Sequence, residues 1–425
     1  MTRIALATLA LSLLLPACNP ADDDGDPSGD PGTTVVGIDP THANTPTTGE
    51  EAGATADEAS STTGGEDEDD TGPDTDPSCT HADIVAEPEI PNVVLVLDKS
   101  GSMVADSSGY WDGDGDDADN DGVVDGDPDN APATPPVTRW RSLHDVVEFI
   151  ATDFEARMDF GAVLFPSTAA KAQYEVSACP VNAEPEVAVG ADQGAAILAT
   201  IPAADDLTLH GGTPAAAGVT TAVAALASLD PERARYMIVV TDGAANCKAD
   251  ALNNTDRFES YDEHFPEAVA DAFAQDIRTF VVGIDIDDSV STANPDGNPD
   301  SINTYERLNA VAEAGGMARP GAEKFYNTLN QVELQEALMK ISVLITSCEL
   351  KLNPAPVMQQ KVSSLVVDPD GVSPLVYEDE VADCAAESGW RFTDETRATI
   401  ELCGEACELY KETGDVSVSF VCIIG

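Results

Sequence analysis

The stretch Val93–Met103, which reads VVLVLDKSGSM, decides the expected fold. Its first five residues are all apolar, which is typical of a short strand buried on both faces of a sheet. An oxygen-rich loop follows at once and places Asp98, Ser100 and Ser102 at every second position. One carboxylate and two hydroxyls at this spacing can converge on a hard divalent cation. The pattern alone is weak, so a metal site is predicted only if later loops supply further oxygen ligands.

Strand-like and helix-like segments alternate along the rest of residues 91–347. Thr138 can cap a helix whose apolar residues recur at the helical period, and Ala172–Ala178 alternates weakly, which indicates an edge strand. The other predicted strands are Phe160–Phe165, Tyr236–Val240, Thr279–Ile284 and Lys324–Tyr326, and the other predicted helices are Gly194–Ile201, Ala215–Leu229, Pro266–Ile277, Thr304–Ala314 and Leu329–Ile345. This order predicts an α/β fold with a doubly wound, mostly parallel sheet. Ligands of such sheets bind beyond the carboxyl ends of the strands.

The segment 348–425 has a different sequence pattern. It contains short strand-like runs separated by turns, at Val362–Val367, Leu375–Tyr377, Thr399–Leu402 and Val416–Cys422, and it holds five of the nine cysteines. We therefore expect a small, disulfide-stabilised β appendage. Because Cys18 belongs to the export signal described below, eight cysteines remain for disulfides, and the sequence does not choose among their pairings.

The first 18 residues predict export. Arg3 precedes an apolar run from Ile4 to Leu15, which is too short for a membrane span and typical of a signal peptide. Leu15–Cys18 resembles the lipobox of bacterial lipoproteins, although Pro16 is not the favoured residue there. The resemblance implies that Cys18 is acylated and anchors the mature chain in a membrane. The alternative is an ordinary secreted protein cleaved near Ala17.

Residues 19–80 predict a disordered acidic linker. They are rich in Asp, Glu, Gly, Pro, Thr and Ser, and almost no large apolar residue is available to form a core. Such a segment would act as an extended tether between an anchor and a folded domain. The whole chain has a net charge of -58, from 20 basic and 78 acidic residues. This excess argues against nucleic acid as a partner and is compatible with cations as ligands.

Two later loops supply the oxygen ligands that the first loop needs. Thr213 follows a glycine pair at the start of a predicted helix, and Asp242 follows the predicted strand Tyr236–Val240. The carboxyl ends of parallel strands share one edge of a sheet, so these loops should meet the first one. Asp98, Ser100, Ser102, Thr213 and Asp242 form an oxygen-only set, which suits Mg²⁺, Mn²⁺ or Ca²⁺.

With these motifs, residues 91–347 resemble the von Willebrand factor A domain family and its metal-ion-dependent adhesion site. The resemblance implies a doubly wound sheet with one antiparallel edge strand. It also implies that the five residues hold the metal directly or through water, and that one open coordination position accepts an acidic group of a protein or matrix partner. A degenerate domain that keeps the fold without metal is the alternative.

The insertion 104–137 departs from the family pattern, in which this link is short. Asp117, Asp119, Asp121 and Asp125 have the spacing of a calcium loop, with Gly122 allowing the tight turn. The insertion lacks the Glu of an EF-hand and is similar to the Asp-rich loops of thrombospondin type 3 repeats. We expect it to bind Ca²⁺; the alternative is a solvated acidic loop.

These features predict a membrane-anchored binding or adhesion protein of the bacterial cell envelope, at the outer membrane or cell surface. A component of an envelope assembly, secretion or motility complex is the main alternative, and calcium storage or sensing is a weaker one. A hydrolytic enzyme is disfavoured, since the five histidines form no His-Glu-x-x-His motif and the sequence contains no Gly-x-Ser-x-Gly elbow. His210 lies beside the predicted metal loops, where packing is the more common role for a lone histidine.

Overall fold

The computed structural model describes residues 85–104, 110–111, 137–356, 360–367, 374–414 and 416–422, all within the compact unit Pro73–Gly425. Several predictions fall outside these residues: the signal peptide 1–18 with its Cys18, the linker 19–80, and the calcium-type residues Asp117, Asp119, Asp121 and Asp125. Among the described helices, none combines the length and the apolar character that crossing a membrane requires.

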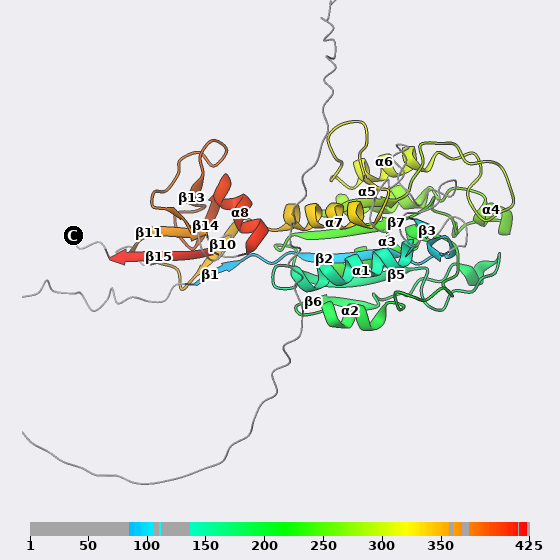
Figure 1. The fold of residues 1–425 in the computed structure, drawn as a ribbon, viewed down its shortest axis with the longest axis horizontal. Helices are drawn as coiled ribbons and strands as arrows, with labels where there is room; N and C mark the ends of the chain where they lie inside the picture. Colours follow the sequence, from blue (N-terminus) through cyan, green and yellow to red (C-terminus); the bar gives the residue numbers. More distant parts are fainter. Residues whose placement is uncertain are drawn as a thin grey trace, which may run out of the picture. The chain divides into compact units, whose positions relative to one another are not determined.

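A six-stranded sheet forms the centre of the α/β part (Figure 1). Its strands stand in the order β6 (Val187–Gly190), β5 (Asp159–Phe165), β2 (Asn92–Asp98), β7 (Arg235–Thr241), β8 (Ile277–Ile284) and β9 (Tyr326–Thr328). All neighbours run parallel except β6, which pairs antiparallel with β5 at the edge. The predicted mostly parallel sheet is confirmed, and it has one antiparallel edge strand.

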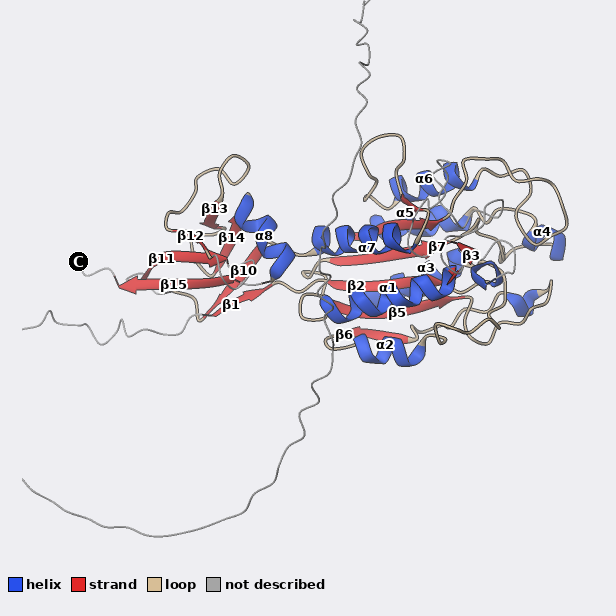
Figure 2. Cartoon of the chain, in the orientation of Figure 1, coloured by secondary structure: helices blue, strands red, loops and turns tan. Residues whose placement is uncertain are grey.

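Helices cover both faces of this sheet (Figure 2). One face packs against α1 (Arg139–Asp153), α2 (Gly194–Thr200) and α7 (Gln331–Ile345), and the other against α3 (Ala215–Ala227), α5 (His264–Phe273) and α6 (Thr304–Ala314). Successive side chains of β2 alternate between the two cores, with Leu95 in one and Val94 and Val96 in the other. Each such side chain contributes about 1.5–3 kcal/mol through burial. An unbroken apolar run is therefore what a central, doubly covered strand requires.

The predicted edge strand Ala172–Ala178 is wrong. This segment is mostly exposed and ends in a 3₁₀ turn, η3 (Val176–Ala178), closed by the local bonds Lys171 N to Ser177 O (2.9 Å) and Ala178 N to Glu175 O (2.9 Å). The true edge strand, β6, follows later in the chain. Weak alternation in an exposed segment carries little information, because strand propensity mainly reflects packing against a neighbour.

Two antiparallel sheets form the C-terminal part. One has the order β1 (Val85–Pro88), β10 (Glu349–Asn353), β14 (Thr399–Cys403) and β13 (Gly389–Phe392), and the other β12 (Leu375–Tyr377), β11 (Gln360–Val367) and β15 (Val416–Cys422). A helix, α8 (Glu405–Thr413), also packs here and buries Tyr410 with Trp390. The sequence predicts only strands and turns in this region, so the helix is a difference from the expected fold. The helix is short, and its burial depends on a core assembled from distant strands.

Three disulfides join described cysteines. Cys348–Cys407 and Cys384–Cys403 lie in the C-terminal part, as expected for a disulfide-stabilised appendage, and Cys179–Cys247 lies in the α/β part. Cys79 and the side chain of Cys422 are outside the described set.

Four short elements complete the described chain. They are η2 (Gly101–Val104), β3 (Tyr110–Trp111), β4 (Val137–Thr138) and α4 (Asn254–Phe258). β3 pairs antiparallel with β4, so the two ends of the acidic insertion lie side by side.

Candidate metal centre

The candidate metal residues lie where β2 and β7 end, at the carboxyl edge of the sheet. Asp98 is the last residue of β2, and Asp242 directly follows the last residue of β7. β2 and β7 are paired neighbours in the sheet, so their two loops emerge side by side. Both aspartates are buried, with Asp98 0% and Asp242 8% exposed. This is the edge at which open α/β sheets hold their ligands.

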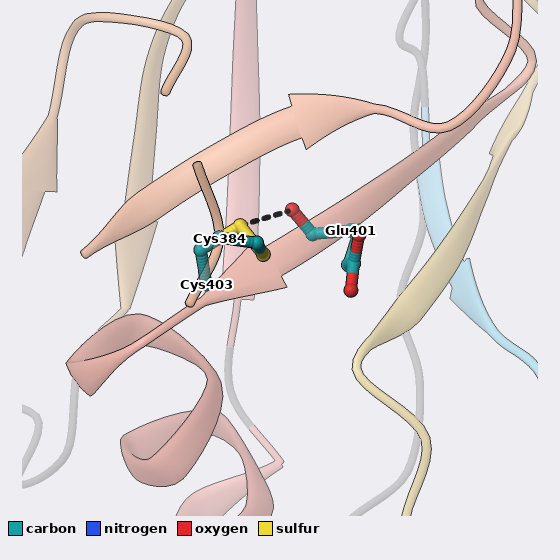
Figure 3. A group of neighbouring side chains, drawn as sticks. All are labelled: Cys384, Glu401 and Cys403. Carbon is teal, nitrogen blue, oxygen red and sulfur yellow. Dashed lines mark hydrogen bonds between the residues drawn. A yellow bond between two sulfur atoms is a disulfide. The ribbon is translucent and has the colours of Figure 1, made fainter. Parts of the chain in front are cut away.

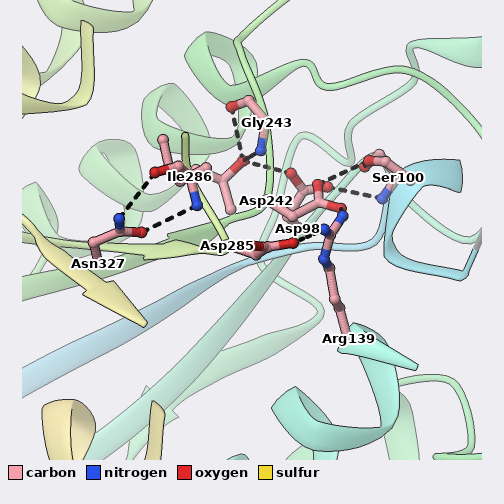
Figure 4. Close-up of polar contacts among 10 residues, drawn as sticks. Asp98, Ser100, Arg139, Asp242, Gly243, Asp285, Ile286 and Asn327 are labelled. Carbon is pink, nitrogen blue, oxygen red and sulfur yellow. Dashed lines mark hydrogen bonds and ion pairs between the residues drawn. The ribbon is translucent and has the colours of Figure 1, made fainter. Parts of the chain in front are cut away.

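A chain of hydrogen bonds links four of the five predicted residues, of which Asp98, Ser100 and Asp242 are labelled in Figure 4. The amide of Ser100 donates to Asp98 Oδ1 at 2.8 Å, which curls the first loop back on its own carboxylate. The hydroxyls of Ser100 and Ser102 lie 2.9 Å apart, and Ser102 Oγ donates to Asp242 Oδ1 at 2.8 Å. The alternating spacing predicted from the sequence therefore does bring the carboxylate and hydroxyl oxygens together.

Thr213 reaches the same place from the second loop. The amide of Gly101 donates to Gly211 O at 3.2 Å, which joins the first and second loops directly. Thr213 is 6% exposed, and its amide donates to Asn246 Oδ1 at 2.7 Å. With Ser100 and Ser102, Thr213 lines a cavity of about 410 Å³. All five predicted residues thus lie at one site.

The two aspartates are electrostatically unfavourable in the absence of a cation. Burial, and to a smaller extent the neighbouring Asp242 carboxylate, raise the pKa of Asp98 from 3.8 to about 7. Hydrogen bonds from Thr241 Oγ1 (2.6 Å) and from the Ser100 amide oppose that rise. Burial also raises the pKa of Asp242, against the opposing charge of Arg139. Two buried carboxylates this close disfavour each other's ionisation, and a divalent cation between them would remove the penalty.

Sequence reasoning missed Arg139, which belongs to this site. It is the first residue of α1, directly after the N-cap Thr138, and it is 7% exposed. Its guanidinium contacts Asp242 Oδ2 at 3.4 Å and forms an ion pair with Asp285, which directly follows β8. One signal could have found it. A cation in the first turn of a helix opposes the helix dipole, so its presence there indicates another partner.

The oxygen ligands fit a hard divalent ion. The five side chains offer carboxylate and hydroxyl oxygens with no His or Cys, which suits Mg²⁺, Mn²⁺ or Ca²⁺ rather than a soft metal. Asp98 and Asp242 would supply the charge, and the hydroxyls of Ser100, Ser102 and Thr213 would complete the ligand set. A bound ion would offer Lewis-acid attraction for a further anionic oxygen at any position that the chain leaves open.

Further residues line the cavity beside the candidate metal residues. Tyr174 stacks on Phe258 with ring centroids 4.6 Å apart, and His210 and Asp296 line the cavity near them. Asn246 connects this wall to the metal loops, because its Nδ2 donates to Gly297 O at 2.7 Å while its Oδ1 holds the Thr213 amide. The Cys179–Cys247 disulfide lies directly beside it in sequence. The second loop is thus held by side chains far from it in the chain.

Other acidic and sulfur clusters among the described residues are weaker candidates. Cys384, Glu401 and Cys403 lie together in the C-terminal part (Figure 3), but the two sulfurs form a disulfide and the Cys403 Sγ contacts the Glu401 backbone oxygen at 3.7 Å. They therefore offer no thiolate to a metal. The other group, on α1, consists of three partly or fully exposed residues, His144, Asp145 and Glu148.

Comparisons with known proteins found partial structural likeness. No protein-family model matches the chain, and no curated protein matches it.

The pilus adhesin SpaC from Lactobacillus rhamnosus GG aligns with 65% of this chain and 33% of its own, at 14% identity and a TM-score of 0.39. BatB from Bacteroides thetaiotaomicron aligns with 59% of this chain and 97% of its own, at 14% identity and 0.34. Proximal thread matrix protein 1 from the mussel byssus, with a zinc-occupied MIDAS motif, aligns with 67% of this chain and 51% of its own, at 13% identity and 0.32. The aligned region spans about a third of the adhesin and about half of the byssus protein.

Proposed function

We propose that this protein is a metal-dependent binding module that recognises an acidic group of a protein or matrix ligand. In this proposal Asp98, Ser100, Ser102, Thr213 and Asp242 hold Mg²⁺, Mn²⁺ or Ca²⁺, and a carboxylate from the partner occupies a remaining coordination position. The role is binding rather than catalysis. Acylation of Cys18 would anchor the chain in a membrane of the bacterial envelope, and the acidic linker 19–80 would hold the module away from that membrane.

One observation carries the proposal. Hydrogen bonds join Asp98, Ser100, Ser102 and Asp242 at the carboxyl edge of the sheet, and Ser100 and Ser102 line a cavity of about 410 Å³ together with Thr213 of the second loop. Asp98 and Asp242 are buried, and the proximity of Asp242 contributes to the raised pKa of Asp98. A bound cation would relieve this unfavourable interaction between the two carboxylates. A divalent ion held by two carboxylates keeps enough attraction for a third carboxylate, because the hydroxyl ligands add no charge.

Mg²⁺ titration calorimetry on the full chain tests the metal site. Asp98→Asn preserves the shape of the side chain and removes its charge, so we expect one Mg²⁺-binding event of the wild type to disappear in this variant. Asp271→Asn is the matched control, because Asp271 is an exposed carboxylate on α5. Equal heats for the wild type and Asp98→Asn would refute metal binding at this site.

Ligand recognition is tested with Mn²⁺ in the site. Water-proton relaxation of bound Mn²⁺ reports coordination positions open to solvent, and we expect the capped peptide Gly-Asp-Gly to lower it while Gly-Asn-Gly does not. Equal effects of the two peptides would contradict recognition of an acidic group. Cross-linking in intact cells then separates two roles: a partner outside the cell supports adhesion, and a fixed envelope neighbour supports an assembly component.

A further inference from the structure

The candidate site contains a cation of its own. Arg139 extends from the start of α1 between two carboxylates, Asp242 on one side and Asp285 on the other (Figure 4). The Arg139 side chain is 9% exposed and that of Asp242 is fully buried, whereas that of Asp285 is 39% exposed. The guanidinium therefore bridges a buried carboxylate of the metal set and a solvent-facing carboxylate outside it.

The two carboxylates that contact Arg139 differ in their other contacts. Asp285 holds its place through its backbone, since its amide donates to Thr328 O at 2.8 Å. The next residue, Ile286, exchanges two hydrogen bonds with the side chain of Asn327, at 3.1 and 2.9 Å. Asp242 contacts Arg139 at 3.4 Å and at the same time accepts a hydrogen bond from Ser102. The guanidinium thus pairs with one carboxylate that belongs to the metal set and with another, Asp285, that lies outside it.

We propose that Arg139 is an internal counter-cation that sets the metal affinity of the site, and that Asp285 limits its competition by holding the guanidinium away from Asp242. The inference rests on the metal site of the proposed function. Asp242 Oδ2 can face either the Arg139 guanidinium or an incoming metal ion. One carboxylate cannot fully neutralise both cations. A guanidinium keeps its charge at every accessible pH, so this competitor is permanent. Among the described residues, Arg139 Nε has no hydrogen-bond partner, so the guanidinium is not saturated in its present position.

The geometry gives two neighbouring substitutions opposite effects. Arg139→Met removes a positive charge beside the ion, so Mg²⁺ should bind about tenfold more tightly or better. Asp285→Asn removes the outer anchor, which leaves the guanidinium to Asp242, so Mg²⁺ should bind several-fold more weakly. Arg139→Lys keeps the charge and should stay within about threefold of the wild type.

A double-mutant cycle separates the proposed route from a direct effect of Asp285 on the ion. If Asp285 acts through Arg139, Asp285→Asn should change the Mg²⁺ affinity by less than about twofold in the Arg139→Met background, since an exposed carboxylate is screened by water. An Asp285→Asn effect of equal size in both backgrounds would overturn this coupling.

The experiment is Mg²⁺ titration calorimetry on the full chain, with Asp98→Asn introduced into each background to identify the binding event at this site. Unfolding by urea in EDTA and in Mg²⁺ provides a second readout: Arg139→Met should lower stability in EDTA, because Asp242 loses its counter-ion, and gain more from Mg²⁺ than the wild type does. If Mg²⁺ binding depends on Asp98 but Arg139→Met leaves its affinity equal or weakens it, the role of Arg139 is refuted and the metal site stands. Absence of Asp98-dependent binding in every chain would overturn the proposed function with it.

Discussion

Replacing Asp98 by asparagine should stabilise the protein when no divalent cation is present. The folded state raises the pKa of this carboxyl from 3.8 to about 7, chiefly through burial. At about 1.4 kcal/mol for each pH unit, the ionised carboxylate therefore destabilises the folded state by about 4 kcal/mol as an upper bound. Asparagine keeps an oxygen for the Ser100 amide and carries no charge, so it avoids this cost at neutral pH.

The sign of the pH dependence follows from the same numbers. Below about pH 4 the carboxyl is protonated in both states and contributes nothing. Between about pH 4 and pH 7 the folded state binds more protons than the unfolded state, so stability falls as the pH rises. From pH 5 to pH 8 this contribution amounts to about 3 kcal/mol. The general repulsion among the acidic residues of the chain also grows with pH, but it affects the wild type and Asp98→Asn alike.

The assay is urea unfolding of the wild type and Asp98→Asn at pH 5 and pH 8, in EDTA and in Mg²⁺. In EDTA the difference between the two proteins should grow by about 3 kcal/mol from pH 5 to pH 8, in favour of the variant. Saturating Mg²⁺ at a hundred times its dissociation constant should stabilise the wild type by about 3 kcal/mol through this site and leave the variant without that gain. A variant that is less stable than the wild type at pH 8 in EDTA would refute the reasoning.

Three further predictions concern the surroundings of the site. Replacing both Cys179 and Cys247 by serine should cost about 2–4 kcal/mol of stability in urea and weaken Mg²⁺ binding, because Asn246 beside Cys247 holds the Thr213 amide; unchanged affinity would contradict this support. Gly212→Ala would place a Cβ 2.7 Å from both Asn246 Oδ1 and Cys247 Sγ. It should therefore reduce Mg²⁺ affinity about tenfold or more in calorimetry with little change in circular dichroism, and wild-type affinity would argue against a crowded second loop. Asp121→Asn should abolish protection of the acidic insertion by Ca²⁺ in limited proteolysis, and equal cleavage of the wild type with and without Ca²⁺ would exclude a calcium loop.

The strands of the central sheet were predictable because their burial is visible in composition alone. A strand covered on both faces must be apolar at every position, and Val93–Leu97, Phe160–Phe165 and Tyr236–Val240 meet this requirement. The edge strand was not predictable, since β6 is short, partly exposed and defined by its neighbour β5. The helix α8 was missed for a related reason: it is short, and the residues that bury it come from strands far away in the chain.

The candidate metal residues were predictable because each follows a recognisable strand or glycine turn. Parallel strands end at one edge, so Asp98 and Asp242 had to emerge together once both strands were assigned to one sheet. Asp285 also follows a predicted strand, but nothing in the sequence paired it with Arg139, whose only signal was an unfavourable position in the first turn of a helix. Arg139 belongs to a different element, and its contacts depend on the entry direction of α1 into the sheet edge, which no local pattern encodes.

The sequence by itself determined which oxygen ligands are available and at which edge of the sheet they would meet, because strand periodicity and loop position are local properties. Only the tertiary structure decided the electrostatics of the site. Burial of Asp98 and Asp242 side by side, and insertion of the Arg139 guanidinium between Asp242 and Asp285, arise from the packing of elements more than a hundred residues apart. The strength of a charge depends on what surrounds it, and the surroundings exist only once the chain has folded.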